Sequence, residues 1–391
     1  MISKLHIGKS TQEDLGAAVA EATGAAMKDA LHPALAVVLA TDGYPGEVLA
    51  GARSRQLGNL PWVGCSAAGV FADAAFLRAG LVVGVVSSPQ AFVGVGAAGP
   101  VSGNPRSAGA AAVARALDQL PARSATRGRM ALLFMNALGG HGAEVVRGAV
   151  HEGGTALAWA GGGAGDNLRF IQAAQFARGQ AFSDHAVAAA LDLPGHTGAG
   201  MRHGWRPYGP PTMVTRARGS HVLELEYEQA FEVYRRSATE RGDEVTREGF
   251  TAFAMRHPLG IPQADGDHLI RDPIGVEADG SLRCVAEVPD GSLVRVMESN
   301  GSDLVGAARA AAEAARAAVG GPLGGAFVFD CVSRFLLLGD QGLRDELNAV
   351  SEGLGQGVPW MGCLTMGEVG ALGAAVPQFH NKTTAVLALP G

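Results

Sequence analysis

Charge is scarce in this sequence, and no basic block is present. Charged residues make up 17% of the chain, compared with about 25% in a typical soluble domain, and the net charge is −6. The concentrated positive charge with which proteins bind a nucleic-acid backbone is therefore missing. We expect no nucleic acid among the direct ligands of this protein.

Cysteines are few and widely separated. The four residues are Cys65, Cys284, Cys331 and Cys363, and no two of them form a C-x-x-C pair. Histidines at H-x-x-x-H spacing are absent as well. This pattern speaks against a disulfide scaffold and against a structural zinc site, and it favours the reducing environment of the cytoplasm with no bound metal.

Long apolar runs are also missing. The longest stretch without a charged residue, from Arg78 to Arg106, is divided by the polar turn Ser87–Gln90. A membrane-spanning helix needs about 20 mainly apolar residues, so two strands joined by a turn fit this stretch better. The first residues, Met1–His6, lack the apolar core of a signal peptide. We expect neither a membrane partner nor a leader.

One phrase, by contrast, occurs three times. In each copy an apolar run ends in Trp-x-Gly, and a second glycine follows a few residues later. The copies span Trp62–Gly69, Trp159–Gly165 and Trp360–Gly367. Each lies behind another apolar run, and these runs are Ala34–Ala40, Met130–Met135 and Gly325–Phe329. Repetition on this scale indicates a structural unit that is used three times.

The first copy shows the order of elements in one unit. A strand at 34–40, a helix at 46–56, the strand that ends in the Gly phrase and paired strands at 80–86 and 91–95 form a β-α-β-β unit. The second unit repeats this order with longer loops, and the third runs from residue 325 to the C-terminus. We predict an α/β (α+β) fold of mixed β-sheets covered by helices, in a layered αββα arrangement.

The pattern changes between the second and third units. Segments at 213–217 and 221–227 alternate like exposed strands, and six charges between Glu240 and Glu248 predict a surface helix or a domain junction. We therefore predict two domains. The first covers residues 10–236 and holds two repeats, and the second covers residues 250–391 and holds the third.

Polar side chains are most concentrated around the third copy. The candidate ligand contacts are Arg271, Cys331, Arg334, Thr365, Glu368, His380 and Asn381. Two arginines beside a carboxylate suit a small anionic or zwitterionic ligand, because guanidinium presents a planar fork of donors to a carboxylate. A structural ion pair between Arg334 and Glu368 is the alternative.

The glycines of the phrase allow two interpretations. They are Gly64, Gly69, Gly162, Gly165, Gly362 and Gly367. Glycines at a strand end can turn backbone N–H groups toward a ligand, or they can simply permit a tight turn. No copy has the spacing G-x-G-x-x-G before a helix or the spacing of a P-loop, so neither nucleotide motif is present.

A cysteine hydrolase is a further alternative. Cys65 and Cys363 occupy equivalent positions in two copies of the phrase, and eleven histidines could supply a base. The second copy has Gly162 at that position, and no motif ties a particular histidine to either thiol. Small buried cysteines explain the same pattern. His141, which follows two glycines, is the most suggestive single histidine.

The order of these features resembles the FIST sensory proteins, in which an N-terminal and a C-terminal region occur together. The likeness extends from about residue 10 to residue 389. The matching segments are Gly64–Gly69, Gly162–Asp166, Gly204-Trp205, Val214-Thr215, Pro258–Gly260, Ile270-Arg271, Cys331–Arg334, Gly367-Glu368 and His380-Asn381. The first phrase departs from the family pattern G-C-S-T-A-G-E at Ala67 and Val70, whereas the third copy keeps Thr365 and Glu368.

The resemblance implies a cytoplasmic sensory module without enzymatic activity. Such a module binds a small molecule, with amino acids and related metabolites as proposed ligands. No kinase, cyclase or F-box region is recognised in the sequence, so signal transduction would need a separate partner protein. A branch of the family is associated with haem and nitric-oxide sensing, which would use one histidine as an axial ligand. No local haem-attachment motif supports or excludes that branch.

Overall fold

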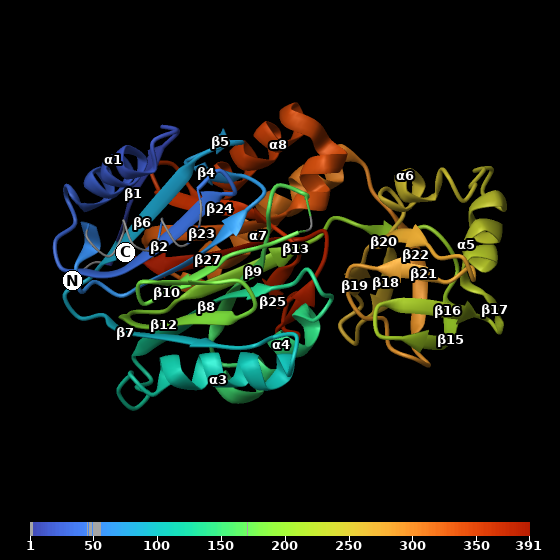
Figure 1. Cartoon of the computed structure of the whole chain (residues 1–391), viewed down its shortest axis with the longest axis horizontal. Helices are drawn as coiled ribbons and strands as arrows, with labels where there is room; N and C mark the ends of the chain where they lie inside the picture. The colour runs from blue at the N-terminus through green and yellow to red at the C-terminus, as the bar shows by residue number, and fades with distance from the viewer. Residues whose placement is uncertain (1–2, 45, 47–48, 50–55, 170) are drawn as a thin grey trace.

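The chain forms a large body and a smaller β-rich lobe (Figure 1). The computed structural model describes residues 3–44, 46, 49, 56–169 and 171–391. The helix predicted at 46–56 lies almost entirely outside the described residues. The described part contains seven helices and several mixed sheets, which confirms the predicted α+β class.

The body consists of three units with the same order of elements. The first contains β1 (Lys4–Ser10), α1 (Leu15–Met27), β2 (Pro33–Thr41), β3 (Trp62–Ala67), β4 (Val70–Ala72), β5 (Ala75–Leu77) and β6 (Leu81–Ser87). The second contains β7 (Phe92–Ala98), α3 (Pro105–Leu117), β8 (Arg127–Asn136), α4 (Gly142–Gly153), β9 (Ala158–Ala164), β10 (Gln175–Ala177), β11 (Gln180–Phe182) and β12 (Ala186–Pro194). The third contains β13 (Gly198–Arg202), α7 (Gly301–Val319), β23 (Leu323–Cys331), α8 (Val332–Leu354), β24 (Trp360–Thr365), β25 (Glu368–Gly370), β26 (Gln378–His380) and β27 (Thr384–Pro390). The predicted repeat is therefore present, and it is longer than the sequence indicated.

The three units exchange hairpins in a cycle. Their sheets have the orders β1-β6-β2-β3-β10-β11, β7-β12-β8-β9-β25-β26 and β13-β27-β23-β24-β4-β5. In each sheet the first four strands come from one unit, and the last two are a hairpin from another. Because every sheet needs a hairpin from a neighbouring unit, no unit completes its own sheet.

The sheets face one another inside the body, and the helices lie on the outside (Figure 1). The interior is apolar and combines all three units. The rings of Phe134 in β8 and Phe329 in β23 lie 5.6 Å apart, in an edge-to-face arrangement that aromatic pairs favour. Burial of these inner faces explains why the strands read as nearly continuous apolar runs in the sequence.

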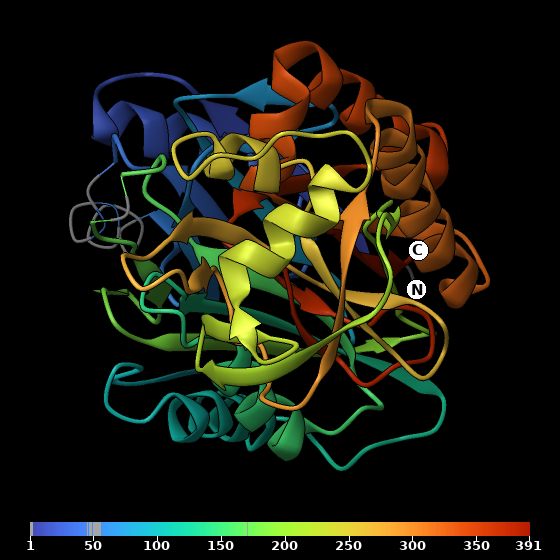
Figure 2. The same cartoon turned by 90° about the vertical axis from the view of Figure 1, so that its right-hand side faces the viewer.

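The lobe is inserted between β13 and α7. Its elements are β14 (Arg206–Pro207), β15 (Thr212–Arg218), β16 (His221–Leu225), β17 (Glu228–Gln229), α5 (Ala230–Thr239), α6 (Phe250–Ala254), β18 (Leu259–Pro262), β19 (His268–Arg271), β20 (Pro273–Val276), β21 (Leu282–Cys284) and β22 (Leu293–Glu298). Figure 2 views the molecule from the lobe side, with the yellow helix α5 in front. The charged segment 240–248 is a mostly exposed loop and contains no helix.

The two bodies do not coincide with the two predicted domains. The lobe spans residues 206–298 and contains the predicted boundary region between 236 and 250. Strand β4 of the first unit pairs with β24 of the third, so residues of both predicted domains share one sheet. The division into 10–236 and 250–391 stays a prediction about sequence regions.

Candidate functional site

The three Gly phrases meet inside the body and bond to one another. Main-chain hydrogen bonds, each 2.9 Å long, connect the copies. The N–H of Gly165 donates to the carbonyl of Ser66, that of Met366 to the carbonyl of Gly163, and that of Leu364 to the carbonyl of Gly69. Each copy thereby contacts both others. Because these amides are used between the units, the contacts favour the turn interpretation over a ligand cradle.

The glycines are needed because the strands approach closely. Gly64, Gly161 and Gly362 occupy the same register position in β3, β9 and β24. A Cβ atom at any of them would lie 2.0 Å or less from a carbonyl oxygen of the adjacent strand. In the second copy, Gly161 therefore has the role of Gly64, and the predicted Gly162 lies one residue further on.

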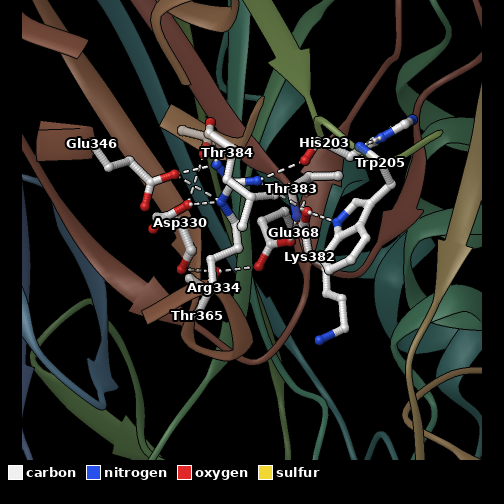
Figure 3. A network of polar contacts seen from close by, with 11 residues as sticks. His203, Trp205, Asp330, Arg334, Glu346, Thr365, Glu368, Lys382, Thr383 and Thr384 are labelled. Atoms are coloured by element: carbon white, nitrogen blue, oxygen red, sulfur yellow. Dashed lines mark hydrogen bonds and ion pairs between the residues drawn. The ribbon is translucent and has the colours of Figure 1, made fainter. Parts of the chain in front are cut away.

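The guanidinium of Arg334 is buried and fully bonded (Figure 3). It forms an ion pair with Glu346 and lies 3.1 Å from Asp330, measured from Nε to Oδ1. Its remaining N–H groups donate to main-chain carbonyls. A structural ion pair therefore exists, but its partners are Glu346 and Asp330 in place of Glu368. No donor of Arg334 remains for a ligand.

A kink in α8 brings Arg334 and Glu346 together. Twelve residues span about 18 Å in a straight helix, which is too far for an ion pair. Gly339 has φ 69 and ψ −173, so it interrupts the helix between the two residues. The positive φ suits glycine, and the resulting bend cannot be read from residue spacing alone.

Glu368 is buried beside Thr365 and Thr383 (Figure 3). The hydroxyl of Thr365 lies 2.8 Å from Oε1, and the hydroxyl and amide of Thr383 donate to Oε2 at 2.8 and 3.2 Å. The thiol of Cys331 also faces this carboxyl group. Burial raises the pKa of Glu368 to about 7, against the opposing effect of these hydrogen bonds.

Arg271 has a different environment from Arg334. It is 3% exposed, and it donates to the carbonyls of Glu287 at 2.6 Å, Ile270 at 3.0 Å and Phe379 at 3.2 Å. No carboxylate of the described residues pairs with it. Burial lowers the pKa of Arg271 to about 10, with a smaller effect in the same direction from Arg147 and an opposing one from Cys284.

His380 and Asn381 follow directly on the Phe379 carbonyl that Arg271 binds. Both side chains are 1% exposed. Within the part of the chain that the structure describes, His380 Nδ1 and both polar atoms of the Asn381 amide have no hydrogen-bond partner. Burial, together with the nearby Arg271, lowers the pKa of His380 to about 3, so this imidazole is neutral. Unpartnered polar groups at such depth are uncommon in native proteins.

The predicted contact set thus divides into two places. Cys331, Arg334, Thr365 and Glu368 belong to a polar network within the body, in which Asp330 Oδ2 and Glu346 Oε2 have no hydrogen-bond partner among the described residues. Arg271 reaches from the lobe to Phe379 in β26, the strand that ends at His380 and is directly followed by Asn381. We therefore take the junction between body and lobe as the candidate site.

The sequence analysis missed Lys382, which joins the body to the lobe. Its ammonium group is buried, lies 3.2 Å from Asp272 Oδ2 and donates to the Met255 carbonyl at 3.0 Å. It also lies 5.5 Å from the ring centroid of Trp205. Two features of the sequence could have identified it: Lys382 is one of only four lysines in the chain, and it directly follows Asn381.

Two cavities lie away from the junction. One, of about 370 Å³, is lined by residues that include Asp73, Ser351 and Trp360. The other, of about 340 Å³, includes Arg169 and Asp42, which already form an ion pair with each other. Neither lining contains a histidine, so neither cavity supports a histidine-ligated haem.

The thiols do not have the properties of nucleophiles. Cys65 and Cys363 are both 0% exposed. Burial, together with contact with the Cys65 thiol, raises the pKa of Cys363 well above its ordinary value, whereas an activated thiol needs a lowered one. Within the described residues, no group of three or more His, Cys, Asp or Glu side chains could hold a metal ion. None of the described helices is long and apolar enough to cross a membrane.

Three interlocked units, an inserted lobe and a polar junction between them define a two-body α+β protein with features of a binding module. Residues 34–228 match the FIST N domain and residues 230–371 match the FIST C domain, so the chain belongs to the FIST family. The resemblance found in the sequence is confirmed. FIST domains are sensory domains of signal transduction proteins.

Two proteins of Mycobacterium tuberculosis, each described as uncharacterized, are 28% identical to the chain over 200 residues. The matches cover 50% of this chain and 51% of each relative, so the chain spans about half the length of the curated relatives it matches. A solved structure of cyanuric acid hydrolase aligns over 100% of both chains, with 9% identity and a TM-score of 0.40.

Proposed function

We propose that this protein is a non-catalytic sensor that binds a small carboxylate-bearing metabolite, such as an amino acid, at the junction between body and lobe. The observation that carries the proposal is the environment of Arg271. A buried cation normally faces a carboxylate, because removal of an unpaired charge from water is costly. Arg271 instead bonds only to carbonyl groups of the described residues. A ligand carboxylate would supply the missing negative charge.

The unpartnered atoms of Asn381 and His380 support the same site. An amide offers both donors and an acceptor, and a neutral imidazole can do either, so these groups suit a ligand that carries an ammonium or hydroxyl group beside its carboxylate. Asn381 belongs to the body and lies two residues after Phe379, whose carbonyl oxygen accepts a hydrogen bond from Arg271 of the lobe. A ligand held there would contact residues of both bodies.

Signalling would follow from the two-body arrangement. Arg271 is 3% exposed, so a ligand reaches it only when the lobe moves relative to the body. Binding would then favour the arrangement in which both bodies contact the ligand, and it would change the relative populations of the two arrangements. A separate protein that recognises one arrangement would carry the signal onward from the cytoplasm.

A thermal-shift screen tests this function. The wild type is heated with each standard amino acid and with small dicarboxylic and keto acids at millimolar concentration. We expect at least one of them to raise the melting temperature of the wild type and to leave Arg271→Met unchanged.

Arg129→Met is the matched control, because Arg129 is also largely buried but is paired with Asp192 at 2.7 Å. It should lower the stability of the free protein and keep the ligand response. The proposal fails if no acid stabilises the wild type, or if Arg271→Met responds like the wild type.

A further inference from the structure

The three units carry different side chains at one equivalent position. Val70, Gln175 and Glu368 each begin the strand that pairs with the Gly phrase of a neighbouring unit, opposite Cys363, Cys65 and Gly162 respectively. Gln175 Oε1 accepts the amide of His185 at 3.1 Å, and Glu368 Oε2 accepts the amide of Thr383 at 3.2 Å. The second and third units therefore each contain an equivalent hydrogen bond. Its accepting side chain is titratable only in the third unit.

The hydroxyl of Thr365 can bond to either form of the Glu368 carboxyl group. The hydroxyl oxygen of Thr365 lies 2.8 Å from Glu368 Oε1 and 3.2 Å from the carbonyl oxygen of Asp330. A hydroxyl has only one proton to donate. If Glu368 donates to Thr365, then Thr365 can donate to Asp330 and both bonds form. An ionised Glu368 would instead accept from Thr365, and its hydrogen bonds with Thr383, Thr365 and Cys331 favour that form, whereas burial opposes it and has the larger effect.

The other groups near Glu368 do not neutralise a negative charge. The thiol of Cys331 in β23 bonds to it, and that of Cys363 in β24 feels its charge. Burial raises the pKa of both thiols well above the ordinary value, so both are neutral. The nearest cation along the chain, Lys382, is paired with Asp272. Burial without a cation explains why the pKa of Glu368 is raised to about 7 from an ordinary 4.5.

Glu368 is connected to the candidate site through the main chain. Thr383, which bonds to Glu368, is preceded by Lys382, whose carbonyl accepts from Arg334 and Trp205. Segment 380–383 therefore carries the candidate contacts His380 and Asn381 and is held in place at its far end by Glu368.

We propose that the proton on Glu368 holds segment 380–383 in place at the junction, and that loss of this proton loosens the segment. Glu368 is thus a positioning residue, and ligand binding at the junction is linked to pH. The link to binding rests on the proposed function, whereas the proton-dependent opening of the segment does not.

The direction and size of the effect follow from linkage. The folded pKa of Glu368 is about 7 and its ordinary value is 4.5, so the contribution of this group to stability is complete below pH 4.5. That contribution decreases as the pH rises and is lost by about pH 7. An opening that exposes Glu368 to water therefore becomes about tenfold more favourable for each pH unit in this window and then stays constant.

Hydrogen exchange of the peptide around 378–384, followed by mass spectrometry without ligand, tests the proposal. After correction for the intrinsic pH dependence of exchange, we expect the ratio of opening in the wild type to opening in Glu368→Gln to increase about tenfold per unit between about pH 5 and about pH 7. The ratio is the measured quantity because opening also exposes His380, whose pKa is lowered to about 3 by burial and whose contribution has the opposite pH dependence in both proteins. Glu368→Gln, which copies the neutral Gln175, should keep only the contribution of His380, so that opening decreases as the pH rises toward about 6.5. Glu368→Ala should exchange faster at every pH, because Thr383 loses its acceptor.

Two outcomes would overturn the proposal. One is a ratio of wild-type to Glu368→Gln opening that does not change with pH, and the other is faster exchange in Glu368→Gln than in the wild type at about pH 7. Neither outcome depends on a ligand, so a failed thermal-shift screen leaves the hydrogen-exchange result intact. If an amino acid does stabilise the wild type, its affinity should change with pH in the wild type and stay constant in Glu368→Gln.

Discussion

The amide of Asn381 provides a direct test of whether the junction is built for a ligand. Both of its polar atoms are buried and have no hydrogen-bond partner among the described residues of the unliganded protein. A buried polar group without a hydrogen bond costs about 1–3 kcal/mol. Replacement by leucine, of similar shape, removes that cost. We expect Asn381→Leu to raise the free energy of unfolding by about 1–3 kcal/mol and to abolish the response to the stabilising acid.

Asn136 supplies the matched control. It also stands at the end of a strand, but its amide donates to Asp184 and accepts from the Leu138 amide, each at 3.2 Å. Asn136→Leu should therefore destabilise the protein and keep the ligand response. Both variants would be compared by urea unfolding and by thermal shift with and without the acid. The reasoning is refuted if Asn381→Leu is less stable than the wild type, or if it keeps the full ligand response.

Three further perturbations follow from the contacts of the body. Arg334→Met should lower the free energy of unfolding by about 3–5 kcal/mol, because it leaves buried carboxyl groups without a cation. Urea unfolding should show that the double variant with Glu346→Leu recovers part of this loss. Gly362→Ala should strongly reduce soluble expression, because its Cβ would lie 1.7 Å from a carbonyl oxygen, whereas Gly306→Ala, in an open helix position, should add up to about 1 kcal/mol. The Cys363 thiol should resist iodoacetamide in the native protein and react after unfolding, which mass spectrometry can follow; rapid native labelling would contradict its burial.

The sequence was a good guide to local structure, since local structure depends on periodicity and turn residues. It predicted the three units, the inserted β-rich segment and the α+β class. It missed β1 at Lys4–Ser10, where residues of mixed polarity form an edge strand. It also missed the hairpin exchange, because a hairpin of two short strands has the same sequence pattern whichever sheet it joins.

The candidate site was predicted less completely, because its properties depend on long-range pairing. The residues were named correctly as a polar concentration, but spacing did not distinguish Arg334, with two buried carboxyl partners, from Arg271, with none. The bend at Gly339 brings Arg334 to its partner Glu346. The contact between lobe and body places Arg271 beside main-chain carbonyl groups.

The sequence by itself determined where glycine was required and where polar groups accumulate. In each Gly phrase a glycine stands two residues after the tryptophan, because the two adjacent strands approach closely there. Each unit therefore contains this glycine in its own sequence. Only the tertiary structure decided which buried groups are satisfied. Hydrogen bonds and ion pairs join atoms that are distant in the chain, so the environments of Arg271 without a carboxylate partner, of the Asn381 amide and of the buried Glu368 carboxyl group exist only in the folded arrangement of body and lobe.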